Sequence, residues 1–360
     1  MLRYFTAGES HGKALSAIIE GYPSNIPISL DYINQELARR QQGYGRGGRM
    51  KIEKDKAEIL SGVRFGKTLG SPISILVKNK DWQNWEQKMA SFDPPPDDLE
   101  EITVARPGHA DYAGAIKYQH KDIRNILERA SARSTAVRVA VGAFAKILLQ
   151  HFNIEITSKI IEIGGQSVQR LKQTVDQAKE KGDSLGGIFE LQIANVPVGL
   201  GSHVHYDRKL DAALAAAIIS IQAIKGVEFG LGFESARRFG SEVHDVFAIK
   251  NEKIFRETNN AGGIEGGISN GQPIIIRAAM KPIPTMMNPL PSIDLDTNQQ
   301  TQAHVERADV CAIEAATVVA ESVVAFVTAK FFLEKYGGDS LQEIQKHFAS
   351  KGYKSFQSKK

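Results

Sequence analysis

The stretch Ala315-Ala316-Thr317-Val318-Val319-Ala320-Glu321-Ser322-Val323-Val324-Ala325 decides the fold. It is rich in Ala and Val and almost free of charge, and it lies inside a longer segment, from about Ala303 to Lys335, that is patterned as one helix. A helix that is apolar on most sides has to be packed on most sides. The sequence therefore predicts a long helix that other elements cover.

Two more helices are predicted by apolar residues that recur at three- and four-residue spacing. The first runs from Ser134 to about Phe152. The second opens at Tyr206-Asp207-Arg208-Lys209, with Asp207 as its N-cap. The residues expected on its buried face are Leu210, Leu214, Ala217, Ile218 and Ile221.

Short segments rich in β-branched residues and bounded by Gly, Asn or Pro predict the strands. They are Ile73–Lys78, Ile154–Ile163, Gly187–Ile193 and Pro273–Ala279. Helices and strands are interspersed without a regular strand-helix-strand rhythm, so the expected class is α+β, with layered elements, and not a doubly wound parallel sheet.

Composition is that of an ordinary globular chain: 360 residues, 42% hydrophobic and 24% charged. No repeat or low-complexity linker divides it, so we expect one domain over residues 1–360. The acidic, proline-rich stretch Asp93–Glu101 is expected to be a surface loop. The N-terminus has no signal-peptide pattern, no stretch approaches eighteen uninterrupted apolar residues, and the single cysteine, Cys311, suits a reducing compartment. A cytoplasmic protein that binds no membrane is expected.

Net charge is +4, from 45 Lys and Arg and 41 Asp and Glu, which does not imply a uniform nucleic-acid coat. The local exception is Arg39–Arg49, an Arg- and Gly-rich stretch. Its glycines satisfy a G-x-G-x-x-G pattern, but the polar segment before them is predicted to be helical, whereas a dinucleotide fingerprint needs a buried strand there. The stretch is therefore either a site for a small anion, which Arg forks bind bidentately, or a solvated or nucleic-acid-binding basic loop.

Histidines in tight turns are the candidates for proton transfer. His11 lies in Gly8-Glu9-Ser10-His11-Gly12, where Glu9 or Ser10 would orient its ring. His109 lies in Arg106-Pro107-Gly108-His109-Ala110-Asp111, beside an arginine. Taken alone, the His11 motif favours an ordinary hydrogen-bonded turn histidine, and turn chemistry also explains the His109 segment.

Glycine, arginine and proline mark three further candidate segments. Glu128–Thr135 places Arg129 and Arg133 at a helix start, where free backbone amides favour an anion, although Ser131 or Ser134 also fits a plain N-cap. The others are Gly262–Gly267, Lys281-Pro282-Ile283-Pro284-Thr285 and Arg307-Ala308-Asp309. Together the segments indicate a small, multiply charged anionic substrate handled with acid-base help, because the basic stretch has only Tyr44 for base stacking. They do not define a reaction.

The chain resembles the chorismate synthase family over essentially its full length. The motifs that carry the resemblance are Gly8–Gly12, Arg40–Arg46, Arg106–Asp111, Arg129–Arg133, Gln222–Glu228, Asn259–Gly263 and Arg307–Asp309. Two departures occur: Ala308-Asp309-Val310 stands where many members have His-Asp-Pro, and Glu314 replaces the Pro of a Cys-x-x-Pro run. A relative that binds flavin without turnover is therefore an alternative, as is an RNA-binding module.

The resemblance implies a β-α-β sandwich with helices layered between antiparallel sheets, assembled as a homotetramer. It implies 1,4-anti elimination of phosphate from 5-enolpyruvylshikimate 3-phosphate, giving chorismate, with reduced FMN required and no net redox change. This lyase reaction is the last step of the shikimate pathway and leads to the aromatic amino acids. Some members carry an NADPH-dependent flavin reductase activity, so NADP enters as a further cofactor of the family; an external reductant is expected for this chain.

Site residues also follow from the resemblance. His11 would protonate reduced flavin or keep it anionic, His109 would act as the acid for the departing phosphate, and Asp309 would be the base through which the C6 proton is taken. The implied substrate-binding residues are Ser10, Arg40, Arg46, Arg49, Arg106, Arg133 and Arg307. The implied flavin-binding residues are Arg129, Ala130, Ser131, Gln222, Ala223, Gly266, Lys281, Pro282, Ile283, Pro284, Thr285 and Arg307. No metal site is implied.

Overall fold

The computed structural model describes residues 1–46, 54–250, 253–305 and 309–350. Its helices are α1 (Leu30–Gln41), α2 (Asp111–Tyr118), α3 (Arg124–Ala130), α4 (Thr135–Gln150), α5 (Leu171–Glu180), α6 (Leu210–Ile219), α7 (Gly240–Val243), α8 (Ile313–Tyr336) and α9 (Leu341–Ser350). The sheet strands are β1 (Arg3–Ala7), β2 (Ala14–Glu20), β3 (Ala57–Ser61), β6 (Ile73–Lys78), β7 (Glu155–Ile163), β8 (Gln166–Ser167), β9 (Gly187–Ala194), β10 (Ile224–Phe229) and β15 (Ile274–Met280). Hairpin strands are β4 (Val63–Arg64), β5 (Lys67–Thr68), β11 (Phe247–Lys250), β12 (Lys253–Arg256), β13 (Ile264–Glu265), β14 (Ile268–Ser269), β16 (Pro291–Asp294) and β17 (Gln299–Gln302).

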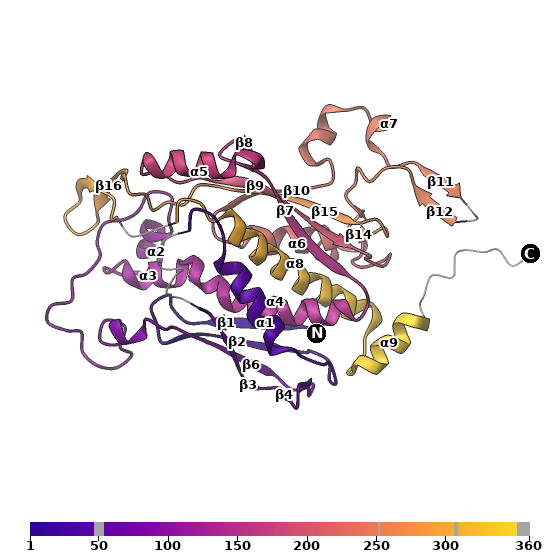
Figure 1. Ribbon diagram of the computed structural model, residues 1–360, viewed down its shortest axis with the longest axis horizontal. Helices are drawn as coiled ribbons and strands as arrows, with labels where there is room; N and C mark the ends of the chain where they lie inside the picture. The colour runs from indigo at the N-terminus through magenta and orange to yellow at the C-terminus, as the bar shows by residue number, and fades with distance from the viewer. Residues whose placement is uncertain (47–53, 251–252, 306–308, 351–360) are drawn as a thin grey trace, which may run out of the picture.

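Two antiparallel sheets enclose a layer of helices, as Figure 1 shows. One sheet has the strand order β1-β2-β6-β3, and the other has the order β10-β15-β9-β7-β8. Helix α4 packs on β2 and β6 of the first sheet, whereas α8 packs on β7 and β9 of the second. The α+β class and the layered sandwich are thereby confirmed.

Helix α8 is the buried centre of the sandwich, as its composition predicts. It is long and apolar enough to cross a membrane, yet 83% of its apolar window is buried inside the fold, as in a core helix. Gly142 of α4 lies against Ser322 of α8, and a Cβ added to Gly142 would come within 2.3 Å of the Ser322 Cβ. The two helices can approach this closely only because position 142 has no side chain.

Most predicted elements are confirmed, including all four strands and the Ser134–Phe152 helix, here α4. Two helix starts are wrong. The late helix begins only at Ile313: the Leu185 amide donates to the Val310 carbonyl at 2.8 Å, so the chain at residues 310–311 lies beside Leu185. Asp207 is not the N-cap of α6, because its carboxylate binds His205 within a separate 3-10 turn; Lys209 is extended and is the N-cap, and the helix begins at Leu210.

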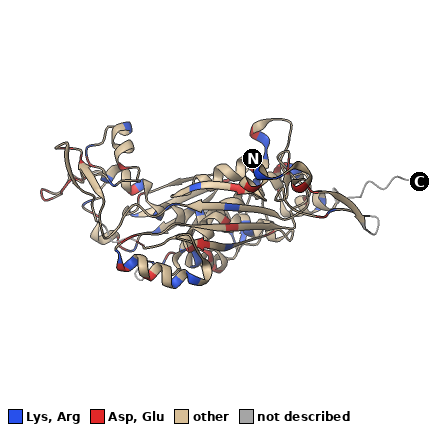
Figure 2. Ribbon diagram, turned by 90° about the horizontal axis from the view of Figure 1, so that it is seen from above, with Lys and Arg blue, Asp and Glu red and all other residues tan. Residues whose placement is uncertain are grey.

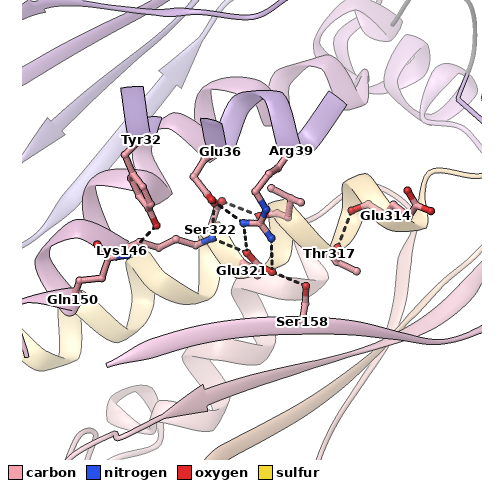
Figure 3. Close-up of polar contacts among 11 residues, drawn as sticks. Tyr32, Glu36, Arg39, Lys146, Gln150, Ser158, Glu314, Thr317, Glu321 and Ser322 are labelled. Carbon is pink, nitrogen blue, oxygen red and sulfur yellow. Dashed lines mark hydrogen bonds and ion pairs between the residues drawn. The ribbon is translucent and has the colours of Figure 1, made fainter. Parts of the chain in front are cut away.

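Four charged side chains form a network inside the helical layer (Figure 3), which we call the interhelical network: Glu36, Arg39, Lys146 and Glu321. Glu321 on α8 accepts hydrogen bonds from Arg39 Nη1 at 2.9 Å and Nη2 at 3.1 Å, and from Lys146 Nζ at 2.7 Å. Lys146 on α4 also reaches Glu36 Oε2 at 2.5 Å. Buried charges in a low-dielectric layer have to be paired, so the network fixes α1, α4 and α8 in one mutual arrangement.

Replacing Lys146 by Met should leave Glu36 and Glu321 with only the half-exposed Arg39 as a cationic partner. We expect the free energy of unfolding to fall by about 3 kcal/mol, because breaking a buried ion pair leaves an uncompensated charge. Urea unfolding followed by far-UV circular dichroism measures this. Glu234→Gln at the exposed Glu234–Arg237 pair is the matched control and should change little. Equal, small effects of both substitutions would contradict a structural role for the network.

Candidate active site

The candidate site is a cavity of about 430 Å³ between the two sheets, at one end of the helical layer. The C-terminal end of α1, the first residue of α4 and the first turns of α8 meet there with the loops that follow α6 and β15. The predicted site residues that line it are Ser10, His11, Arg40, Arg46, Arg106, His109, Ala130, Ser131, Arg133, Gln222, Ala223, Lys281, Ile283, Pro284, Thr285 and Asp309. Segments from the whole length of the chain therefore converge on one cavity.

Some predicted site residues lie elsewhere. Arg129 is exposed outside the cavity and donates to the carbonyls of Thr6 and Gly8, and Gly266 lies in the β13–β14 turn near His203. Pro282 lines an adjoining cavity that shares Gly108 and Lys281 with the first. Arg49 and Arg307, with the departure at Ala308, lie outside the described residues. The roles of all these residues stay predictions.

Positive charge dominates the described lining, which holds Arg40, Arg46, Arg106, Arg133 and Lys281 and one carboxylate, Asp309. Two helix N-termini, those of α4 and α8, also point their positive dipole ends at the cavity. This arrangement suits a ligand that carries several negative charges.

Buried carboxylates behind the lining compensate the arginines. Asp55 Oδ2 accepts from Arg133 Nη1 at 2.7 Å and lies 3.9 Å from Arg40 Nη1. Arg40 also donates to the Thr135 hydroxyl at 3.1 Å. Sequence reasoning missed Asp55, because its pairing with Arg133 spans 78 residues and leaves no local signal.

His109 is held by a buried carboxylate and a buried arginine. Its Nδ1 lies in hydrogen-bond contact with Asp111 Oδ1 and 3.1 Å from Arg106 Nη2. Arg106 donates to Asp111 through Nε at 2.8 Å and through Nη2 at 3.2 Å. Burial by itself raises the pKa of the Asp111 carboxyl, but the hydrogen bonds from His109 and Arg106 outweigh it, so that pKa lies well below its usual range.

His11 is also held by a buried carboxylate, but not by the predicted one. Glu9 is exposed, and neither Glu9 nor Ser10 orients the imidazole; its Nδ1 lies 2.7 Å from Glu128 Oε1 on α3. The His11 backbone amide donates to the other oxygen of Glu128, again at 2.7 Å. The Trp85 ring stacks on the imidazole with a centroid distance of 3.9 Å. The prediction about Glu9 and Ser10 is wrong because α3 brings in a partner 117 residues away.

Asp309, the predicted base, pairs with Arg46 at 3.0 Å. The loop that carries Arg46 is attached to the start of α8: the Val310 amide donates to the Gly45 carbonyl at 2.8 Å, and the Tyr44 amide donates to Glu314 at 3.2 Å. Val310 and Glu314, the two described residues that depart from the family pattern, therefore both contact this loop. Cys311 beside them is a buried free thiol, as expected.

One wall of the cavity is apolar. It is built from small and aliphatic side chains of α8 and of the loops after α6 and β15, namely Ile221, Ala223, Met280, Ile283, Ala312, Ala315, Ala316 and Val319. A flat, largely apolar ring system fits against such side chains, while a charged partner fits against the arginines of the same lining. The cavity thus has the chemistry for two ligands of different character.

Fold and site together define the class: a layered α+β enzyme with two carboxylate-held histidines at a cationic cavity for a small molecule. Comparison with known proteins identifies the class as carbon–oxygen lyase: the family described as chorismate synthase matches residues 2–333. The chain belongs to the chorismate synthase family.

Relatives support this over nearly the full length. Chorismate synthase of Pelobacter propionicus is 56% identical, over 97% of this chain and 98% of its own. That of Thermoanaerobacter pseudethanolicus is 58% identical, over 96% and 97%. A crystal structure of chorismate synthase superposes with a TM-score of 0.78 at 45% identity, over 97% of this chain and 96% of that chain.

The buried Asp111 makes a prediction about pH. A carboxyl whose pKa is lowered on folding stabilises the fold above its unfolded pKa, near 4, and this stabilisation is lost as the pH falls further. The difference in free energy of unfolding between the wild type and Asp111→Asn should therefore be largest at weakly acidic to neutral pH and should shrink below about pH 4. Urea titrations at a series of pH values measure it, and a difference that stays constant down to pH 2.5 would contradict the ion pairing.

Proposed function

We propose that this protein converts 5-enolpyruvylshikimate 3-phosphate to chorismate by 1,4-anti elimination of phosphate, with reduced FMN bound in the cavity. The observation that carries the proposal is the convergence of four arginines and a lysine on one cavity that also holds two histidines and a carboxylate. The substrate brings one phosphate and two carboxylates, and charge-assisted bonds from guanidinium groups are the strong way to bind them.

The apolar wall and its surroundings fit a flavin. We propose that Ala130, Ser131, Gln222, Ala223 and the loop Lys281–Thr285 hold it, with Arg129, Gly266 and Arg307 as further predicted partners. The Gln222 side chain is oriented by the Ser134 hydroxyl at 3.1 Å, and Lys281 Nζ donates to the Gly108 carbonyl at 2.6 Å, which ties the flavin loop to the His109 loop. Reduced flavin supplies the low-potential electron density that makes cleavage of the carbon–oxygen bond feasible.

The chain's own residues would divide the remaining work. The C3–O bond breaks with the electron pair going to phosphate, a proton leaves C6, and a diene forms without net oxidation. Arg40, Arg46, Arg106 and Arg133, with Arg49 and Arg307, would bind the anionic groups and disperse the charge that develops on phosphate. His109 would donate a proton to the departing phosphate, His11 would control protonation of the flavin, and Asp309 would receive the C6 proton.

Arg46 pairs with Asp309, so an anionic substrate would compete for the guanidinium and release the carboxylate to act as a base. A single buried cysteine fits a reducing, cytoplasmic compartment, and one large core cluster, beside a small second one at α2 and α3, fits a one-domain protein. An RNA-binding role is less well supported, because Lys and Arg are interspersed with Asp and Glu along the described ribbon in Figure 2.

An anaerobic assay tests the reaction. With dithionite-reduced FMN and 5-enolpyruvylshikimate 3-phosphate we expect release of phosphate and a diene absorbing in the near ultraviolet. Correctly folded protein that forms no product would contradict the proposal and favour a relative without turnover. Turnover with NADPH and oxidised FMN alone would replace the expected external reductant by an intrinsic one.

Substitution of a substrate clamp should act on affinity. Arg46→Met removes one charge-assisted contact worth about 1.5–3 kcal/mol, so the KM for substrate should rise about 10- to 100-fold. Arg237→Met, at an exposed arginine far from the cavity lining, is the matched control and should leave KM unchanged. A KM for Arg46→Met within twofold of the wild type would remove Arg46 from the substrate site.

We also propose that the chain assembles as a homo-oligomer, in keeping with the tetramer implied by the family. Support comes from the arm formed by β11, β12 and α7, which projects from the body in Figure 1. It exposes Phe239, Phe247, Ile249 and Ile254, and Ile249 and Ile254 are cross-strand neighbours. An isolated two-stranded hairpin is marginal in water, and exposed apolar patches of this kind mark interfaces.

The double substitution Ile249→Lys/Ile254→Lys places charge on that arm and should lower the assembly mass measured by light scattering. The wild type should have the mass of four chains. Glu257 is exposed directly after β12, and Glu257→Lys makes the same change in charge without removing apolar area, so it should leave the mass unaltered. An unchanged mass for the double variant would exclude the arm from the interface.

A further inference from the structure

We infer that Glu128 is the positioning residue of His11, holding the imidazole in the tautomer with its proton on Nδ1 and its Nε2 as the nitrogen that acts at the cavity. The inference rests on the proposed function, in which His11 handles a proton at the flavin. Nothing in the sequence motifs points to Glu128 for this role.

Geometry restrains His11 from three sides. The Glu128 Oε1 atom lies 2.7 Å from His11 Nδ1, and Oε2 accepts a hydrogen bond from the His11 backbone amide, also at 2.7 Å. One carboxylate therefore fixes both the ring and the turn. The Ser10 amide donates to the Glu128 backbone carbonyl at 3.0 Å, which ties the same turn to α3. Trp85 covers one face of the ring, and its own indole N–H donates to Asp81 at 3.0 Å. The imidazole therefore has little freedom to flip or to exchange its two nitrogens.

Chemistry then sets the tautomer. A carboxylate only accepts hydrogen bonds, so a nitrogen at 2.7 Å from Glu128 Oε1 carries a proton. In neutral imidazole the proton on Nδ1 leaves Nε2 as the acceptor, and the ring then gains or loses its second proton at Nε2. The same device orients histidines in carboxylate-histidine pairs elsewhere.

Burial makes Glu128 dependable in this role. The Glu128 side chain is 1% exposed, and the Arg124 guanidinium, one helical turn earlier, lies 3.4 Å from its Oε1. Arg124 also lies over the Trp85 ring at 5.0 Å, so carboxylate, guanidinium, indole and imidazole form one packed group. His109 differs, because its Nδ1 is shared between the acceptor Asp111 and the donor Arg106. Of these two histidines, only His11 therefore has contacts that define its tautomer.

Glu128→Gln tests the inference, because it keeps the shape and one oxygen for the His11 amide but offers Nδ1 no carboxylate. We expect kcat to fall at least about 10²-fold, with KM for substrate and affinity for oxidised FMN within about threefold of the wild type. Glu128→Asp should recover part of the loss, since it restores the charge on a shorter arm. Glu9→Gln, at the exposed neighbour of the motif, is the matched control and should retain full activity.

A second readout is independent of turnover. In protein labelled with ¹⁵N-histidine, with the His11 signals assigned by comparison with His11→Asn, long-range ¹H–¹⁵N correlations should show Nδ1–H in the wild type and a changed tautomer in Glu128→Gln. Wild-type activity in Glu128→Gln, or an unchanged Nδ1–H signal, would overturn the inference. If the tautomer changes in Glu128→Gln but the wild type forms no chorismate, the inference stands and the proposed function is overturned instead.

Discussion

The structure depends on one electrostatic constraint: several guanidinium groups line the same cavity, mostly out of water. Like charges repel, and each group loses hydration, so such a cluster is stable only when carboxylates stand behind it. Asp55 forms ion pairs with Arg133 and Arg40, Asp111 forms one with Arg106, and Asp309 forms one with Arg46. The unfavourable free energy of bringing these cations together is thereby offset during folding, so the groups that bind an anionic ligand are already oriented.

The layered fold supplies the rigidity that this arrangement needs. Helix α8 runs through the centre between two sheets, and its first turns line the cavity, while Glu321 further along it anchors α1 through Arg39. The next residue of α1 is Arg40, which faces the cavity. The interhelical network and the site are therefore two ends of one packed unit, and the closeness of α4 and α8 at Gly142 holds that unit together.

The sequence predicts the elements better than the partners. Strands β6, β7, β9 and β15 are visible because β-branched residues are bounded by turn formers, and α4 is visible through its apolar period. The start of α8 was missed because pairing with Leu185 competes with the helix at residues 310–311. The arginine and histidine motifs locate the cavity, but Glu128 and Asp55 leave no signal near His11 and Arg133, because packing across about 80 to 120 residues brings them there. Proximity along the chain favours Glu9 as the residue that orients His11, but Glu128 on α3 has that role in the fold.

The most direct measurement of the central claim is a crystal structure of the protein with oxidised FMN and 5-enolpyruvylshikimate 3-phosphate. The account predicts the isoalloxazine ring against the wall formed by Ala312, Ala316 and Val319, and the substrate's phosphate and carboxylates within hydrogen-bond distance, about 3 Å, of Arg40, Arg46, Arg106 or Arg133. Substrate bound on another surface, with these guanidinium groups still paired to Asp55, Asp111 and Asp309, would contradict it.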